Sequence, residues 1–201
     1  MTDPGYKAHE TAVIDDGCEI GAGTRIWHFC HVMPGAVIGR DCVLGQNVFV
    51  GPGSKLGDRC KVQNNVSVYA GVECEEGVFL GPSMVFTNVI NPRATIERKD
   101  EFKVTRVGRG ATIGANATVV CGVTLGRYCM IGAGAVVTRD VPDFGMVYGV
   151  PGRLQGYVCR CGVTLPGGLM EGESGGATCP SCGAAYARGP EGRVAPTEAS
   201  G

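Results

Sequence analysis

The feature that most constrains this sequence is an aliphatic residue that recurs every six positions. The spacing holds from Ile14 to Phe86, and it resumes after an interruption, from Val107 to Val137. Seventeen of the nineteen positions in this register are Val, Ile or Leu. A repeat of fixed period indicates a stack of similar units, each of which buries its apolar residues only against its neighbours.

Residues on either side of the register positions are small. The residue that follows is often glycine, as at Gly45 and Gly114, and we expect it to supply the positive φ of a sharp corner. The residue two positions before is small or β-branched, as at Ala36 and Ala117. The pattern therefore predicts a short strand and a turn every six residues, with three hexads forming an 18-residue triangular coil.

Most of the eleven cysteines fit the same pattern. Without an export signal, a disulfide framework is not expected. Five cysteines fall on the small inward position, where a free thiol acts as a compact hydrophobe. They are Cys18, Cys30, Cys42, Cys60 and Cys129. Cys74 replaces an aliphatic residue and is expected in the core, and Cys121 lies off the column without an assignment.

Composition and charge exclude several classes of protein. The chain has 201 residues, is 44% hydrophobic and contains 34 glycines, which suits one main domain rich in turns. Its net charge of −1 and the lack of any Lys/Arg-rich run argue against nucleic acid as a partner. No apolar signal core or membrane-length apolar window is present, so a cytoplasmic protein without a membrane span is expected.

The hexad is interrupted between Phe86 and Val107. An excursion loop is therefore expected over residues 88–106. From Arg93 to Arg106 it carries five basic and three acidic residues. Two interpretations stay open: a solvated surface loop, or a lid that contacts an anionic substrate.

The 18-residue period also predicts columns of polar residues at one corner of the coil. His28, Gln46 and Asn64 would superimpose, with Asn47 and Asn65 in the neighbouring column. This column is either a binding surface or a stabilising asparagine ladder at the turns.

Several segments resemble one family closely. They are IWHFCHV (26–32), GQNVFVG (45–51), QNNVSVY (63–69), GPSMVFTNVINPRA (81–94), IERKDE (96–101), GATIGANATVVCGVTLG (110–126), IGAGAVVTRDVP (131–142) and GVPGR (149–153). Together they look like the UDP-2-acetamido-3-amino-2,3-dideoxy-glucuronate N-acetyltransferases, over nearly all of residues 9–153. The FTN and NPR segments are the most specific part of the likeness.

The resemblance implies a fold and an activity. The fold would be all-β, a left-handed parallel β-helix of hexapeptide repeats over residues 1–156. The activity would be transfer of acetyl from acetyl-CoA to the 3-amino group of a UDP-linked amino sugar, in O-antigen type polysaccharide biosynthesis. The assembly would be a homotrimer with active sites at the subunit boundaries.

Roles for individual residues follow from the same resemblance. Asn88 would lie where the amine meets the thioester, to orient the amine or stabilise the oxyanion. The proton would leave through water, through the CoA sulfur, or through His28 or His31, since histidine suits this task near neutral pH.

Further positions are expected to bind the two substrates. Arg93, and less strongly Lys99, would contact the diphosphate or the uronate, because the planar guanidinium matches both. The residues expected to contact the acceptor are Gln46, Asn64 and Asn65. The residues expected to line the CoA channel are Ala115, Ala133, Val150, Pro151 and Arg153.

A second module is expected after the hexads end. Cys159 and Cys161 form one close pair, and Cys179 and Cys182 form another. Paired cysteines at this spacing predict a zinc-ribbon-like knuckle over residues 157–188, with a structural Zn²⁺ because four thiolates leave no open position. Unmetallated thiols or a redox pair are the alternatives. Residues 189–201, rich in Gly, Pro and Ala, are expected to be disordered.

Three rival functions remain to be weighed. The first is acetylation of another amino sugar nucleotide, such as a dTDP-linked 3-amino hexose. The second is a metal hydrolase of carbonic-anhydrase type, which needs three converging histidines; His9 is expected to lie far from His28 and His31, against this function. The third is a non-enzymatic β-helix scaffold, which has no reason to bind CoA.

Overall fold

Short strands alternate with tight turns along nearly the whole chain. The computed structural model describes residues 5–172 and 175–197, and these residues contain strands but no α-helix. Their one helical element is the 3-10 turn η1 (Lys99–Glu101). No helix in these two ranges is long and apolar enough to cross a bilayer.

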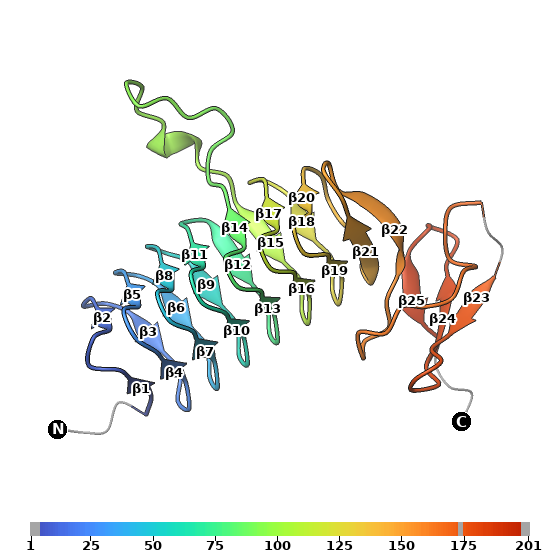
Figure 1. Cartoon of the computed structure of the whole chain (residues 1–201), viewed down its shortest axis with the longest axis horizontal. Coiled ribbons are helices and arrows are strands. Elements are labelled where there is room, and N and C mark those ends of the chain that lie inside the picture. Colours follow the sequence, from blue (N-terminus) through green and yellow to red (C-terminus); the bar gives the residue numbers. More distant parts are fainter. Residues whose placement is uncertain (1–4, 173–174, 198–201) are drawn as a thin grey trace.

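Three parallel sheets form the faces of a triangular prism (Figure 1). Face A contains, in spatial order, β1 (Lys7–Ala8), β4 (Arg25–Ile26), β7 (Val43–Leu44), β10 (Lys61–Val62), β13 (Phe79–Leu80), β16 (Thr112–Ile113), β19 (Met130–Ile131), β21 (Gly145–Tyr148) and the antiparallel β22 (Arg153–Tyr157). Face B contains β2 (Val13–Ile14), β5 (His31–Val32), β8 (Phe49–Val50), β11 (Ser67–Val68), β14 (Val85–Phe86), β17 (Thr118–Val119) and β20 (Val136–Val137). Face C contains β3 (Glu19–Ile20), β6 (Val37–Ile38), β9 (Lys55–Leu56), β12 (Val72–Cys74), β15 (Thr105–Val107) and β18 (Thr124–Leu125).

Neighbouring strands of a face are one coil apart in the sequence. Val32 pairs with Val50 on face B, and Ile26 pairs with Leu44 on face A, each an offset of 18 residues. The hexad prediction of an 18-residue triangular coil is therefore confirmed. Figure 1 shows these coils stacked along the long axis of the molecule.

The inward column forms the core. Val32, Leu44 and Val62 have no exposed surface. Four of the five cysteines predicted on the small inward position are buried among them, and Cys18 is half-buried in the first coils. Burial raises the pKa of the Cys74 and Cys129 thiols to about 12, so both remain protonated at neutral pH.

The glycine that follows a register position serves a different purpose from the one predicted. Gly114 does not have a positive φ, and the left-handed residues of these turns lie two positions later, as at Asn47 and Asn65. A Cβ at Gly114 would lie 2.5 Å from the backbone nitrogen of Ala133 on the next coil. These glycines are needed because successive coils approach too closely for a side chain.

The excursion loop leaves the prism between β14 and β15. Residues 87–104 carry no strand, and Figure 1 shows this segment projecting away from the coils. The Lys103 N–H donates to the Asn88 carbonyl at 3.0 Å, which ties the two ends of the loop together.

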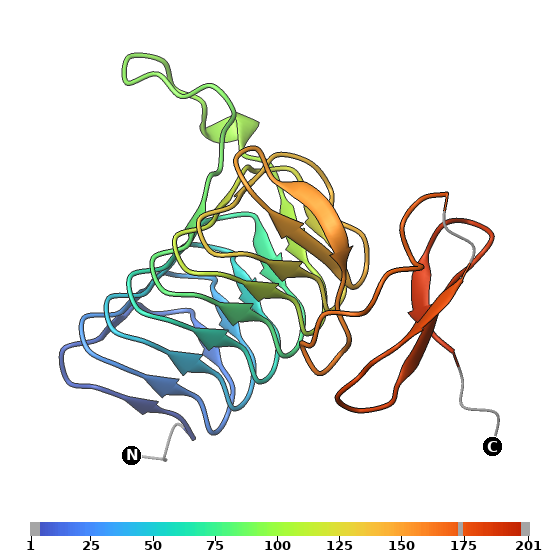
Figure 2. The same cartoon turned by 45° about the vertical axis from the view of Figure 1, so that its right-hand side comes forward.

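A small second unit follows β22. It holds an antiparallel sheet of β23 (Gly176–Thr178), β24 (Ala185–Arg188) and β25 (Val194–Pro196), seen beside the last coils in Figure 2. Disorder was predicted from residue 189 onward, and for residues 189–197 this is wrong. β25 pairs with β24, and Val194 is buried. Residues 198–201 of that predicted tail lie outside the described residues.

Candidate functional site

The turns that join face A to face B carry the predicted polar residues, and we call this edge the polar corner. Here the Gln46 N–H donates to Asn64 Oδ1 at 2.9 Å, and Asn47 Nδ2 donates to Asn65 Oδ1 at 3.1 Å. All four side chains are exposed. The predicted superposition of successive coils is confirmed, and the corner presents amide groups to solvent as well as to each other.

The three histidines lie close to the N-terminal end of the solenoid. The expectation that His9 lies far from the others is wrong, because its ring stacks on that of His28 at a centroid distance of 3.5 Å. His9 Nδ1 is also 3.0 Å from Thr11 Oγ1. Within the described residues, the only side-chain cluster suited to a metal ion consists of four cysteines.

His31 has a different environment from the other two. It lies half-exposed on face B, with Nε2 3.0 Å from Asp15 Oδ2 and its ring edge-on to Phe49. A carboxylate on one ring nitrogen fixes the tautomer and leaves Nδ1 able to accept a proton. Among the candidate bases, His31 therefore has a carboxylate partner, Asp15, of the kind that orients a histidine acting as a general base.

Asn88 sits at the root of the excursion loop. Asn88 is half-buried, and its backbone carbonyl accepts the Lys103 backbone N–H. The preceding Thr87 accepts the Cys121 backbone N–H through Oγ1 at 2.9 Å. The sequence left Cys121 unassigned, and here its backbone anchors the loop. These two hydrogen bonds fix the backbone on both sides of the Asn88 side chain.

Asn88 and His31 are not brought together. Asn88 follows β14, and two strands, β8 and β11, separate β14 from β5, which carries His31. At about 4.8 Å per strand, the two residues lie roughly 14 Å apart along the solenoid axis. At most one of them can act at the same reacting atom within one chain.

Cations of the loop differ in how they are partnered. Arg93 is exposed, and within the described residues its guanidinium donates only to the Pro92 carbonyl and forms no ion pair. Lys99 lies 3.5 Å from Glu97, and Arg98 pairs with Glu101 at 2.6 Å. Arg93 therefore has no competing carboxylate in the described part of the chain and is available to an anionic ligand, and Lys103 of the same loop is also exposed there without an ion pair.

Residues expected near CoA lie toward the C-terminal end of the prism. Ala115 and Ala133 occupy the polar corner after β16 and β19, and Val150 is 73% exposed. Arg153 lines a pocket of about 280 Å³ together with Arg139. Sequence reasoning missed Arg139, which lies two residues after β20 and places a second cation in that pocket.

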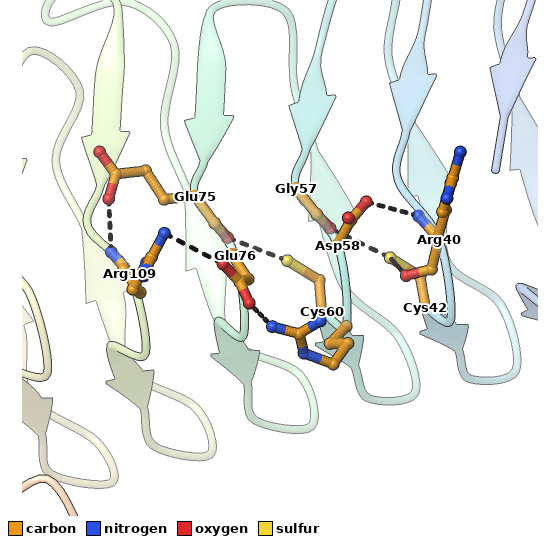
Figure 3. Close-up of polar contacts among 9 residues, drawn as sticks. Arg40, Cys42, Gly57, Asp58, Cys60, Glu75, Glu76 and Arg109 are labelled. Atoms are coloured by element: carbon orange, nitrogen blue, oxygen red, sulfur yellow. Dashed lines mark hydrogen bonds and ion pairs between the residues drawn. The ribbon is translucent and has the colours of Figure 1, made fainter.

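Several charged residues of the prism contact residues of a neighbouring coil. At the corner between faces C and A, Figure 3 shows Asp58 accepting the Arg40 N–H at 2.8 Å, Glu75 accepting the Arg109 N–H at 2.8 Å, and Glu76 pairing with Arg109 at 3.1 Å. Cys42 and Cys60 point from inside toward carbonyls of the next coil, at 3.2 Å each. This corner joins coils, and it holds none of the predicted site residues.

The four C-terminal cysteines form a compact cluster. Their sulfurs lie within 4.8 Å of one another, with Cys159 and Cys182 at 3.4 Å and Cys161 and Cys179 at 3.6 Å. Four Zn–S bonds of about 2.3 Å in a tetrahedron place the sulfurs about 3.8 Å apart. The donor set and its dimensions therefore fit a tetrahedral metal with no position left for water.

Two hexapeptide-repeat family models match the coils. The family model "Bacterial transferase hexapeptide (six repeats)" matches residues 17–52 and 105–139, and "Hexapeptide repeat of succinyl-transferase" matches residues 35–70. The coils are thus those of a β-solenoid of the left-handed β-helix type.

Similar proteins share most of this chain. The dTDP-3-amino-3,6-dideoxy-alpha-D-galactopyranose 3-N-acetyltransferase of Aneurinibacillus thermoaerophilus is 42% identical over 76% of the chain and 79% of its own length. A structure of GDP-perosamine N-acetyltransferase from Caulobacter crescentus with CoA and GDP-perosamine is 26% identical, with a TM-score of 0.44, over 74% of this chain and 55% of that one. A Bacillus cereus acetyltransferase structure is 16% identical, with a TM-score of 0.50, over 77% and 83%. The chain therefore belongs to the hexapeptide-repeat acetyltransferase family.

Proposed function

We propose that the chain moves acetyl from acetyl-CoA to the 3-amino group of a nucleotide-linked 3-amino sugar. One observation carries this proposal: the order of side chains along the solenoid axis. Amide-bearing residues of the polar corner, Gln46 and Asn64, precede the coil of Asn88, and the small residues Ala115 and Ala133 follow it. A sugar nucleotide on the first side and a pantetheine arm on the second would meet near Asn88.

Asn88 is the group proposed at the reacting atoms. The neutral amine attacks the thioester carbonyl, the C–S bond breaks as the tetrahedral intermediate collapses, and the ammonium proton leaves to solvent or to the departing CoA sulfur. The side-chain N–H of Asn88 would stabilise the developing oxyanion, or its carbonyl would orient the amine. His31, supported by Asp15, and His28 remain the alternative proton acceptors, which requires that the amine lie near their coil.

The proposed assembly is a homotrimer. Asn88 stands at the edge of face B where the loop begins, and the polar corner runs along the opposite edge. A ligand that contacts both sets of residues is more easily held between two copies than across one face. Val13 and Val85 on face B are 55% and 46% exposed, which suits burial against a second copy.

Two acceptors are proposed, each on its own observation. UDP-2-acetamido-3-amino-2,3-dideoxy-glucuronate, an intermediate for O-antigen type polysaccharide, is favoured by the FTN and NPR segments and by the unpaired Arg93. A dTDP-linked 3-amino-3,6-dideoxyhexose is favoured by the 42% identity to the enzyme named for that sugar. The uronate carries a carboxylate that the deoxyhexose lacks, so the two differ in the charge that they bring.

The acceptor assignment predicts turnover with a 3-amino sugar nucleotide. Thiol release from acetyl-CoA should follow addition of the UDP-linked uronate, with kcat/KM at least about tenfold above that for the dTDP-linked hexose, because one added ion pair contributes about 1.5–3 kcal/mol. The reverse preference would assign the dTDP sugar. No release with either, in protein that binds acetyl-CoA, would refute 3-amino acceptors.

A structural Zn²⁺ is the second proposed ligand of the chain. Cys159, Cys161, Cys179 and Cys182 would hold it as thiolates, and it supplies no open position for catalysis. Purified protein should contain about one zinc ion per chain by elemental analysis. The double variant Cys161→Ser with Cys179→Ser should lose it, and Cys18→Ser should keep it. Four freely titrating thiols and no metal in the wild type would contradict the site.

A further inference from the structure

The two ends of the solenoid differ in how their cores are closed. In the first coils, Ile14, Cys18 and Ile20 remain only partly buried. In the last coils, Val137, Val141 and Val147 are at most 5% exposed. The C-terminal end of the core is therefore covered by residues that have no counterpart among the described residues of the first coils.

The cover is β22 together with the cysteine-bearing unit. Leu154 of β22 packs against the solenoid core and against the second hydrophobic cluster as well. That second cluster combines Phe144, from the last coil, with Tyr157, Leu165 and Tyr186. The two cores therefore meet at Leu154, which packs against both.

Phe144 is the centre of this contact. Its ring stacks on Tyr128 of the solenoid at 5.5 Å and meets Tyr186 of β24 edge-on at 5.3 Å. Its carbonyl also accepts the Val158 N–H at 2.8 Å. Phe144 is 4% exposed and joins three segments, so its ring is a main apolar contact between the solenoid and the second unit.

The same aromatic cluster is tied to the cysteines. Tyr186 is 1% exposed, its hydroxyl donates to Cys159 Sγ at 3.2 Å and accepts the Arg160 N–H at 2.9 Å. Cys159 and Cys179 are themselves buried members of the cluster. Apart from β23 to β25, this unit consists of turns, and a cation bound by the four thiols would hold those turns together.

We propose that the metal-held unit is the end cap of the solenoid and controls acetyl-CoA binding. The metal fixes Cys159, which lies two residues beyond β22, and β22 pairs with β21 across residues 149–152. Those residues and Arg153 form the segment assigned to CoA, so the part of the inference that concerns CoA rests on the proposed function. When the metal is lost, Tyr186 and Phe144 lose their fixed positions. The pairing of β22 with β21 then weakens, and residues 149–153 become disordered.

Hydrogen exchange with mass spectrometry tests the cap on the full chain. Metal-loaded protein and protein treated with a zinc chelator are compared, peptide by peptide. Removal of the metal should speed exchange in β21, β22 and β24, and it should leave β7 and β8 unchanged, because protection in a stacked solenoid depends on nearest neighbours. Equal protection of β21 and β22 in both forms would overturn the cap.

Affinity for acetyl-CoA, measured by calorimetry on the same two samples, tests the control of binding. We expect the dissociation constant to rise about tenfold without the metal. Cys18→Ser serves as the cysteine control and should behave as wild type. If metal-loaded protein does not bind acetyl-CoA at all, the proposed function fails while the exchange result still decides the cap.

The variant Phe144→Leu tests the cap without removal of the metal, in the event that metal-free protein aggregates. Phe144→Leu keeps all four thiols and should retain the metal, but it removes the ring that joins the unit to the solenoid. Exchange in β22 should rise and acetyl-CoA affinity should fall severalfold with zinc still bound. Wild-type exchange and affinity in this variant would show that the unit is only a neighbour of the solenoid.

Discussion

Replacing Asn88 with alanine should lower kcat by about 100-fold, because loss of one oxyanion or orienting contact typically costs a factor of 10² to 10³. Asn88 is held on both sides, by Lys103 at its own carbonyl and by Cys121 at Thr87, so the truncation leaves the loop root in place. Acetyl-CoA affinity should therefore stay near the wild-type value. Steady-state kinetics with calorimetric binding of acetyl-CoA checks both statements.

Two controls make this result specific. Asn91→Ala removes an exposed amide from the same loop, three residues away, and should leave kcat within about twofold, as surface substitutions do. His31→Gln, roughly 14 Å along the axis, should also retain kcat, since its coil is too distant to share the reacting atom. Full activity in Asn88→Ala together with a large loss of kcat in His31→Gln would indicate that the amine reacts near the coil of His31.

The coil itself was predictable from sequence because one physical requirement repeats at a fixed interval. Each register position faces the same core, so Val32, Leu44 and Val62 obey the same constraint and reveal the period. The inward cysteines follow for the same reason. The contact between Asn47 and Asn65 follows as well, since residues 18 apart must stack once the period is known.

Features that depend on contacts between coils were harder to predict. The repeat marks where glycines occur, but the close approach of Gly114 to Ala133 is a property of stacking distance, so the predicted positive φ was wrong. The position of His9, in contrast, could have been predicted from the register of the hexads. Ala8 pairs with Ile26 and occupies a register position, which places His9 opposite Trp27 and therefore beside His28. An alanine, however, does not stand out in an aliphatic count.

The C-terminal strand β25 shows a different limit. Its surroundings are rich in Gly and Pro, so composition favours disorder. Order comes from the partner: the edge of β24 offers unpaired backbone groups, and Val194 adds one apolar side chain to the cluster beneath. Composition describes a segment alone, and it cannot report a sheet edge supplied by residues elsewhere in the chain.

Replacing Arg93 with alanine should raise the KM of the nucleotide sugar by about 30-fold, the loss expected for one charge-assisted contact of roughly 2 kcal/mol. Arg93 is the appropriate target because it makes no ion pair within the described residues, so its guanidinium is free to bind an anion. The KM of acetyl-CoA should not change, since the residues assigned to CoA lie on later coils. Initial rates with each substrate varied in turn provide the measurement.

Matched variants identify which anion Arg93 binds. Arg93→Lys keeps the charge but loses the planar fork, so an intermediate KM is expected. Lys99→Ala removes a cation already paired with Glu97 and should have little effect. If Arg93 binds the diphosphate, UDP-linked and dTDP-linked sugars should lose affinity equally; if it binds the uronate, only the UDP-linked sugar should. Unchanged KM values for both sugars in Arg93→Ala would show that the loop is a solvated surface segment and that Arg93 does not bind the sugar nucleotide.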